Sequence, residues 1–331
     1  MNLILKSDLQ ERQILFDVAK GVGILLVIWG HTACPFMDEI YAFHMPFFFM
    51  VSGFFFRRKE NFKAQISYNI KRIGIPYLLF SILIYLYYRV FCLVFKLDFD
   101  HSAIDIINII PYNNLVFQTL WFLVALFIIA TFYYYFSKIK NGYLLFALCL
   151  LLHFVSSISI STLPNPFFIL TAMGSLFYYY VGNKIYEKYK EIFTSSRFLL
   201  KIVYFLLSVS FYVLSFKANK FVDNEYLSIL ISLLTAFSGA FSLIYFSSFL
   251  LRIKYISTAL SYIGRNSLCI YVLHYPLLEF TNPVSSLFFV RDTYLWGGVN
   301  VFLNLLVTIV ATEILYRIFP KMLGKKIENN K

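Results

Sequence analysis

Long apolar runs separated by short polar segments dominate the chain. They cover approximately residues 16–35, 41–57, 74–95, 114–136, 142–161, 166–182, 198–216, 226–250, 266–280 and 297–319. A helix needs about 20 predominantly apolar residues to cross the hydrocarbon core of a bilayer. The runs are continuous and lack the two-residue alternation of a membrane strand, so the pattern predicts helices. We therefore expect an all-α fold: a polytopic membrane bundle of about ten transmembrane helices, forming a single domain over residues 1–331.

Composition supports this class. The 331 residues are 60% hydrophobic and only 14% charged, and the mean hydropathy is +0.72, which is more apolar than the core of a soluble domain can accommodate. The first run contains Asp17 and Lys20 and ends without a small-residue cleavage site. We therefore expect it to stay in the mature protein rather than to act as a cleaved signal peptide.

The distribution of basic residues predicts the orientation. Ten spans place both termini on one side, and lysine and arginine collect in cytoplasmic loops. With the N-terminus inside, all but six of the 29 lysines and arginines lie in cytoplasmic segments. Lys96, Lys217, Lys220 and Arg291 lie outside, and Lys20 and Arg89 lie within spans. The prediction is N-in and C-in, and the net charge of +12 indicates membrane orientation rather than nucleic-acid binding.

The first run also carries the polar residues that most need an explanation. Asp17, Lys20 and His31 interrupt it, although a charge at the centre of a bilayer costs about 2.5–3.5 kcal/mol. His31 lies eleven positions after Lys20, which places them on one helix face about 16 Å apart along the axis. One interpretation is that Lys20 and His31 form a functional polar face on this helix. The alternative is that both residues are only tolerated near the helix ends, where Lys20 extends toward the interface.

His31 and His44 flank a short turn that the topology places outside. A neutral imidazole suits a general base, since its ordinary pKa is near 6.5, and His31 is the candidate. Cys34 and Cys92 lie near outer helix ends and could form a pair, whereas no ligand set at metal-binding spacing completes His31, Cys34 and His44. We predict no metal site and no permanently bound cofactor.

Several segments together resemble one known family. They are FDVAKGVGILLVIWGH, which contains Lys20 and His31, FHMPFFFMVSGFFF at 43–56, IKRIGIPY at 70–77, LWFLVALF at 120–127 and SLCIYVLHYPLL at 267–278. The chain resembles the integral-membrane acyltransferase 3 family and, within it, the fucose 4-O-acetylase-like sugar O-acetyltransferases. One position departs from the family pattern: many members carry an Arg-x-x-Arg pair before the third span, and here Asn69 takes the first place and Arg72 the second.

The resemblance implies an O-acyltransferase of the bacterial cytoplasmic (inner) membrane. Such an enzyme moves an acyl group, usually acetyl, from cytoplasmic acyl-CoA to a hydroxyl of a cell-envelope or lipid-linked glycan. The implied partners are therefore acyl-CoA (acetyl-CoA) as donor, a glycan acceptor and membrane lipids, with no nucleic acid and with a homo-oligomer left open. The catalytic candidates are His31 and His44.

Other residues are candidates for binding the two substrates. For the CoA phosphates they are Lys20, Arg57, Arg58 and Arg72, which lie at or near the predicted cytoplasmic mouth. For the acceptor they are Tyr271 and His274, which share a helix face, although an interfacial hydrogen bond explains this pair equally well.

Two other functions compete with this hypothesis. A transporter or flippase of a polysaccharide intermediate also has many spans and buried charges, but it is expected to show repeat symmetry in its hydropathy, and no repeat is visible. A structural or sensory membrane subunit needs no chemistry. An enzyme should gather its histidines beside one site, as the His31–His44 turn predicts, which favours an acyltransferase.

Overall fold

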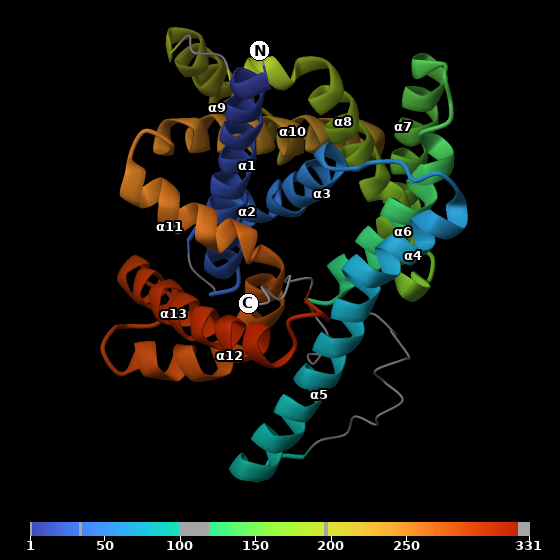
Figure 1. Ribbon diagram of the computed structural model, residues 1–331. Coiled ribbons are helices and arrows are strands. Elements are labelled where there is room, and N and C mark those ends of the chain that lie inside the picture. Colours follow the sequence, from blue (N-terminus) through green and yellow to red (C-terminus); the bar gives the residue numbers. More distant parts are fainter. Residues whose placement is uncertain (1, 33–34, 99–118, 195–197, 324–331) are drawn as a thin grey trace. The chain divides into compact units, whose positions relative to one another are not determined.

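The computed structural model describes residues 2–32, 35–98, 119–194 and 198–323 (Figure 1). Its α-helices are α1 (Asn2–Gly30), α2 (Met37–Tyr41), α3 (His44–Phe54), α4 (Phe62–Asn69), α5 (Ile75–Phe95), α6 (Trp121–Phe136), α7 (Gly142–Ser159), α8 (Ile169–Thr194), α9 (Phe198–Asn219), α10 (Glu225–Leu250), α11 (Lys254–Arg265), α12 (Ser267–Ser286) and α13 (Tyr294–Ile318). A π-helical turn, η1 (Ile70–Gly74), joins α4 to α5, and a 3₁₀ turn, η4 (Pro166–Phe168), precedes α8. No strand occurs in the described ranges, so the all-α prediction is confirmed.

Six helical segments are long and apolar enough to cross a membrane. They are Gln13–Gly30, Phe62–Phe95, Gly142–Ser159, Phe198–Asn219, Glu225–Leu250 and Tyr294–Ile318. These segments correspond to the predicted runs near 16–35, 74–95, 142–161, 198–216, 226–250 and 297–319. The chain is therefore a multi-pass membrane protein.

Two differences from the predicted spans concern helix length. The run at 41–57 is divided between α2 and α3, and the 11 residues of α3 extend over only about 16 Å at 1.5 Å per residue. By contrast, α11 was not predicted at all, because its 12 residues are amphipathic and contain no long apolar run. The first residues of the run at 114–136 lie outside the described residues.

The chain divides into two compact units. The first contains residues 1–55, 181–271 and 278–306, and the second contains residues 56–180, 272–277 and 307–331. In the first unit α1 packs against α3, α10 and α11, and α9 packs along α10 (Figure 1). In the second unit α6 contacts α4, η1 and η4.

The contact between α1 and α11 depends on glycine. A Cβ atom built on Gly21 would overlap the carbonyl oxygen of Leu260, and one built on Gly264 would overlap the carbonyl oxygen of Asp17. Small residues allow this close backbone approach, as is usual between helices in membranes. The contact holds α11 against the segment of α1 that carries Asp17 and Lys20.

Candidate functional site

His31 follows directly after the last residue of α1. Its backbone N–H donates to the carbonyl oxygens of Val27 and Ile28, and its Nδ1 lies 2.8 Å from the Val27 carbonyl oxygen. A carbonyl oxygen only accepts, so Nδ1 carries the proton of this hydrogen bond. The neutral ring therefore keeps its lone pair on Nε2, the nitrogen that a general base uses.

His44 repeats this arrangement at the start of α3. Its side chain is 6% exposed, and its Nδ1 lies 2.9 Å from the carbonyl oxygen of Ile40. The same reasoning assigns the proton to Nδ1 and the lone pair of the neutral ring to Nε2. Both candidate catalytic histidines thus have one ring nitrogen fixed by a carbonyl four residues earlier in the chain.

Tyr41 joins the two imidazoles into one group, which we call the histidine cluster (His31, Tyr41 and His44). Its ring centroid lies 5.8 Å from that of His31 and 5.1 Å from that of His44. Its hydroxyl donates to the carbonyl oxygen of Gly30 over 2.9 Å, which fixes the phenol against the end of α1. The structure thus gathers the predicted pair His31 and His44 and adds Tyr41, which the sequence analysis did not select.

Lys20 has a partner on its own helix. Its Nζ lies 2.8 Å from Oδ1 of Asp17, and both side chains are partly buried, with exposed fractions of 22% and 17%. The ammonium also lies 6.0 Å from the ring centroid of Phe55. The spacing of three residues places the two charges on adjacent turns of α1, so Lys20, near the start of the first run, belongs to an ion pair and is not a lone cation.

The other cations predicted to bind CoA phosphates belong to the second unit. Arg57 and Arg58 are exposed, and Arg58 donates to the carbonyl oxygen of Ser137 over 3.2 Å. Arg72 lies in η1, the type of helical turn that is often found at functional sites, and donates to the Tyr68 hydroxyl over 2.8 Å. The predicted cation set is therefore divided between the two units.

Two lysines missed at the sequence level accompany these arginines. The Nζ atom of Lys59 lies 3.9 Å from the ring centroid of Tyr68, and that of Lys138 lies 4.2 Å from the ring centroid of Tyr134. Cation–aromatic contacts at these distances are favourable. Basic residues interleaved with tyrosines, as in the segments 57–72 and 134–140, were the signal for this surface.

The departure at Asn69 has a structural explanation. Asn69 is buried and donates through Nδ2 to Oγ1 of Thr131 over 3.0 Å, while Nε2 of Gln65 donates to Oδ1 of Asn69 over 3.5 Å. Gln65 in turn accepts from the backbone N–H of Lys59 over 3.1 Å. An uncharged amide therefore connects α4 to α6 at the position where many members of the resembled family carry arginine.

Tyr271 and His274, the predicted acceptor residues, lie one turn apart on α12. Their exposed fractions are 5% and 0%. Tyr271 belongs to the first unit and His274 to the second. Both lie inside the protein, and their role in acceptor binding stays a prediction.

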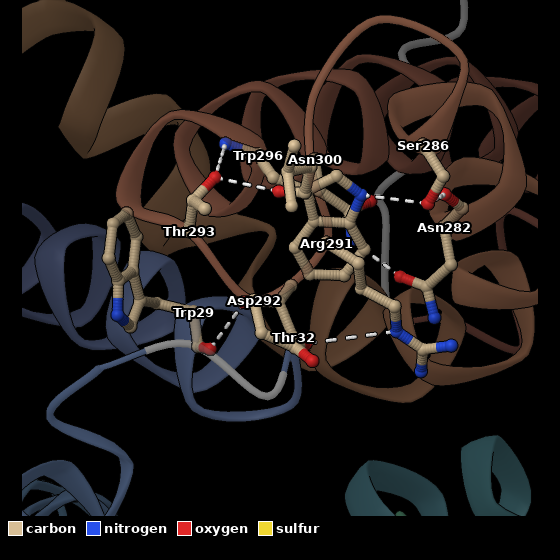
Figure 2. A network of polar contacts seen from close by, with 10 residues as sticks. Trp29, Thr32, Asn282, Ser286, Arg291, Asp292, Thr293, Trp296 and Asn300 are labelled. Carbon is tan, nitrogen blue, oxygen red and sulfur yellow. Dashed lines mark hydrogen bonds and ion pairs between the residues drawn. The ribbon is translucent and has the colours of Figure 1, made fainter.

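A polar network that the sequence analysis missed lies where α12 turns into α13 (Figure 2). Nδ2 of Asn300 donates to Oδ1 of Asn282, the indole N–H of Trp296 donates to Oγ of Ser286 over 3.0 Å, and Arg291 lies 3.7 Å from Asp292. Figure 2 shows Trp29 and Thr32, which flank His31, as part of this network. The signal was a row of polar residues at every fourth position of the last apolar run: Asn300, Asn304, Thr308 and Thr312.

The predicted Cys34–Cys92 pair falls partly outside the described residues. Cys92 has a free thiol, while Cys34, its proposed partner, lies outside the described residues. In the described part of the chain, no three His, Cys, Asp or Glu side chains form a group that could hold a metal ion.

The fold and the site define a multi-pass membrane protein with paired imidazoles at the end of its first spanning helix. A family model described as an acyltransferase domain matches residues 14–317. The chain belongs to this family, acyltransferase 3, as the sequence resemblance predicted. Over 134 residues it is 28% identical to nodulation protein NolL of Mesorhizobium japonicum, a match that covers 36% of this chain and 34% of that protein. The match thus spans about a third of the relative, and no solved structure matches the chain.

Proposed function

We propose that this protein is a membrane O-acyltransferase that moves an acyl group, most simply acetyl, from cytoplasmic acyl-CoA to a hydroxyl of a cell-envelope or lipid-linked glycan in the bacterial cytoplasmic membrane. Family membership supports acyl transfer. The main support for the proposed chemistry is the histidine cluster, in which the Nδ1 atoms of His31 and His44 both form hydrogen bonds to backbone carbonyl oxygens. This leaves Nε2 as the basic nitrogen of each neutral ring.

The proposed reaction needs one proton transfer in each direction. The acceptor hydroxyl oxygen attacks the thioester carbonyl carbon while its proton passes to Nε2 of His31. The tetrahedral intermediate then breaks its C–S bond, and the departing CoA sulfur takes the proton from His31. One ester forms for each thioester that is cleaved, and the base is regenerated. His44, which the Tyr41 ring connects to His31, is the second catalytic candidate and orients the acceptor or His31.

Binding of the acyl-CoA donor requires positively charged side chains. CoA carries phosphates, which arginine and lysine bind through charge-assisted hydrogen bonds. Arg57, Arg58 and Arg72 offer exposed guanidinium groups for this purpose, and Lys20 contributes an ammonium that Asp17 orients. The donor is a substrate that is released as CoA, so the proposal requires no resident cofactor.

Mass spectrometry of envelope glycans tests this function. Glycans are compared from a deletion strain, from the strain complemented with the unaltered gene, and from the strain complemented with His31→Ala. We expect an increment of about 42 Da, the mass added when acetyl replaces hydrogen, only with the unaltered gene. An identical glycan profile in all three strains would overturn the proposal.

The same experiment addresses the alternative function. A transporter or flippase of a polysaccharide intermediate would change the amount or the location of the glycan and leave its mass unchanged. Accumulation of an intermediate in the deletion strain, without any missing acyl increment, would favour this alternative.

A further inference from the structure

Four polar side chains lie at the end of α12 and on α13, and we call them the amide cluster (Asn282, Ser285, Ser286 and Asn300). Ser285 and Asn300 are buried, Asn282 is half-buried and Ser286 is exposed. Ser285 and Asn300 are both 0% exposed. Their atoms Ser285 Oγ and Asn300 Oδ1 have no hydrogen-bond partner among the described residues. Buried polar atoms are normally paired, and an unpaired one destabilises the folded protein. Two such atoms in one cluster indicate that a ligand or ordered water completes it.

Several other atoms of the cluster are already hydrogen-bonded. The Ser286 hydroxyl donates to the Asn282 carbonyl oxygen over 2.9 Å and accepts from Trp296. Asn282 accepts from Asn300. Exchanging the oxygen and nitrogen of the two amides would change which atom is unfilled, and the cluster would still lack a partner. The unfilled capacity is therefore a property of this residue set.

The chemistry of the unfilled atoms selects the ligand. With Oδ1 unfilled, Asn300 requires a donor; with the amides exchanged, its Nδ2 requires an acceptor, and the Ser285 hydroxyl can both accept and donate. A ligand hydroxyl meets either requirement, whereas an anion brings only acceptors. The charges at the edge of the cluster are balanced as well, since Arg291 lies beside Asp292 and both are more than half exposed. This combination suits a neutral polyhydroxyl compound better than a phosphate.

The cluster lies near the proposed base. Thr32 and Trp29 flank His31 and belong to the polar network in Figure 2, which also includes Arg291 and Asp292. The ring centroid of Phe36, on the segment that leads from His31 to His44, is 6.0 Å from that of Tyr294 at the start of α13. All of these residues belong to the first unit.

We propose that the amide cluster binds the hydroxyl groups of the acceptor glycan and holds it beside His31. This inference rests on the proposed function and adds a binding site for the acceptor on α12 and α13, distinct from the Tyr271–His274 pair. Ser285 and Asn300 then supply hydrogen-bond acceptors for ring hydroxyls, and the exposed Arg291–Asp292 pair contacts hydroxyls that extend toward solvent.

The test uses purified protein in proteoliposomes, radiolabelled acetyl-CoA as donor, and an envelope glycan extract from the deletion strain as acceptor. For Ser285→Ala and Asn300→Ser, we expect the half-saturating amount of extract to rise about fivefold each, as for the loss of one hydrogen bond, while the half-saturating acetyl-CoA concentration stays unchanged. Ser247→Ala is the matched control, because Ser247 is also 0% exposed on a spanning helix and its hydroxyl is satisfied by the Leu243 carbonyl oxygen. It should change neither value.

The outcomes separate this inference from the proposed function. Unchanged dependence on extract in Ser285→Ala and Asn300→Ser, together with loss of labelling in His31→Ala, would overturn the amide-cluster proposal and leave the acyltransferase intact. A lower thermal midpoint with equal changes in donor and acceptor dependence would also overturn it, because that result indicates hydrogen bonding between helices alone. Absence of labelling with the unaltered protein would overturn both.

Discussion

The end of a helix sets the chemistry of His31. The last carbonyl groups of a helix have no partner in the next helical turn. The Val27 carbonyl oxygen instead accepts hydrogen bonds from the backbone N–H and the ring Nδ1–H of His31. His44 bonds to Ile40 in the same way. Sequence spacing placed both histidines near one turn, but the protonated nitrogen follows from backbone geometry that no residue pattern reveals.

Removal of the His31 imidazole should abolish transfer. We expect His31→Ala to lower kcat by a factor of about 10²–10⁴, the usual contribution of a general base, with an unchanged elution profile in size-exclusion chromatography. His153→Ala is the matched control, because the Nδ1 atom of His153 also lies against a carbonyl oxygen, that of Gly174 at 2.8 Å, and His153 is buried. Equal activity of the two variants would contradict the role of His31.

The Lys20–Asp17 ion pair leads to a second prediction for single residues. Lys20→Ala should raise the donor KM and nearly preserve kcat, since a phosphate contact is made equally in the ground state and the transition state. Lys20→Arg should be tolerated better than Lys20→Gln, because it retains the charge.

Asp17→Asn serves as its control in the same acetyl-CoA titration. This variant frees the ammonium of Lys20 from its partner at 2.8 Å, so we expect a donor KM no higher than that of the unaltered protein. A loss of kcat at an unchanged donor KM in Lys20→Ala would instead place the ammonium at the reacting carbonyl.

At the scale of elements, hydropathy predicted the long helices and missed those that depend on tertiary contacts. The residues of α11 that pack inward, such as Leu260 and Ile263, are spaced for an amphipathic helix, but the helix contains no apolar run of the length that marks a span. Its position depends on Gly21 and Gly264, whose partners are distant in sequence. The amide cluster was not predicted for a similar reason, because Asn282, the hydrogen-bond partner of Asn300, lies on another helix.

The glycine contact between α1 and α11 predicts a stability difference. Gly21→Ala should destabilise the protein by about 1–3 kcal/mol, as for other overpacked contacts, because the added methyl group would overlap the Leu260 carbonyl oxygen. Gly142→Ala is the control, since no atom lies within 4 Å of a Cβ built there. Thermal unfolding in detergent measures both variants, and equal midpoints would show that α11 does not pack as described.

At the scale of the whole molecule, the distribution of charge predicts which helix ends face the cytoplasm. Reporter fusions after Lys59, Lys140 and Arg252 should score as cytoplasmic, and those after Asn219 and Asp292 as external. The fusion at Asp292 matters most, because it fixes the side of the membrane on which the amide cluster and the histidine cluster open. A cytoplasmic score at Asp292 would contradict the predicted orientation and would place both clusters on the cytoplasmic side of the membrane.

The ion pair within α1 also bears on how the protein is made. This helix leaves the ribosome before the helices that follow it, so a lone lysine in it would enter the bilayer without a counter-charge from any of them. Asp17 lies three residues before Lys20 on the same helix, and the pair forms as soon as this turn of helix forms. The helix therefore carries its own neutralising group through the translocon, and Lys20 stays paired in the bilayer until α11 is made and packs beside it.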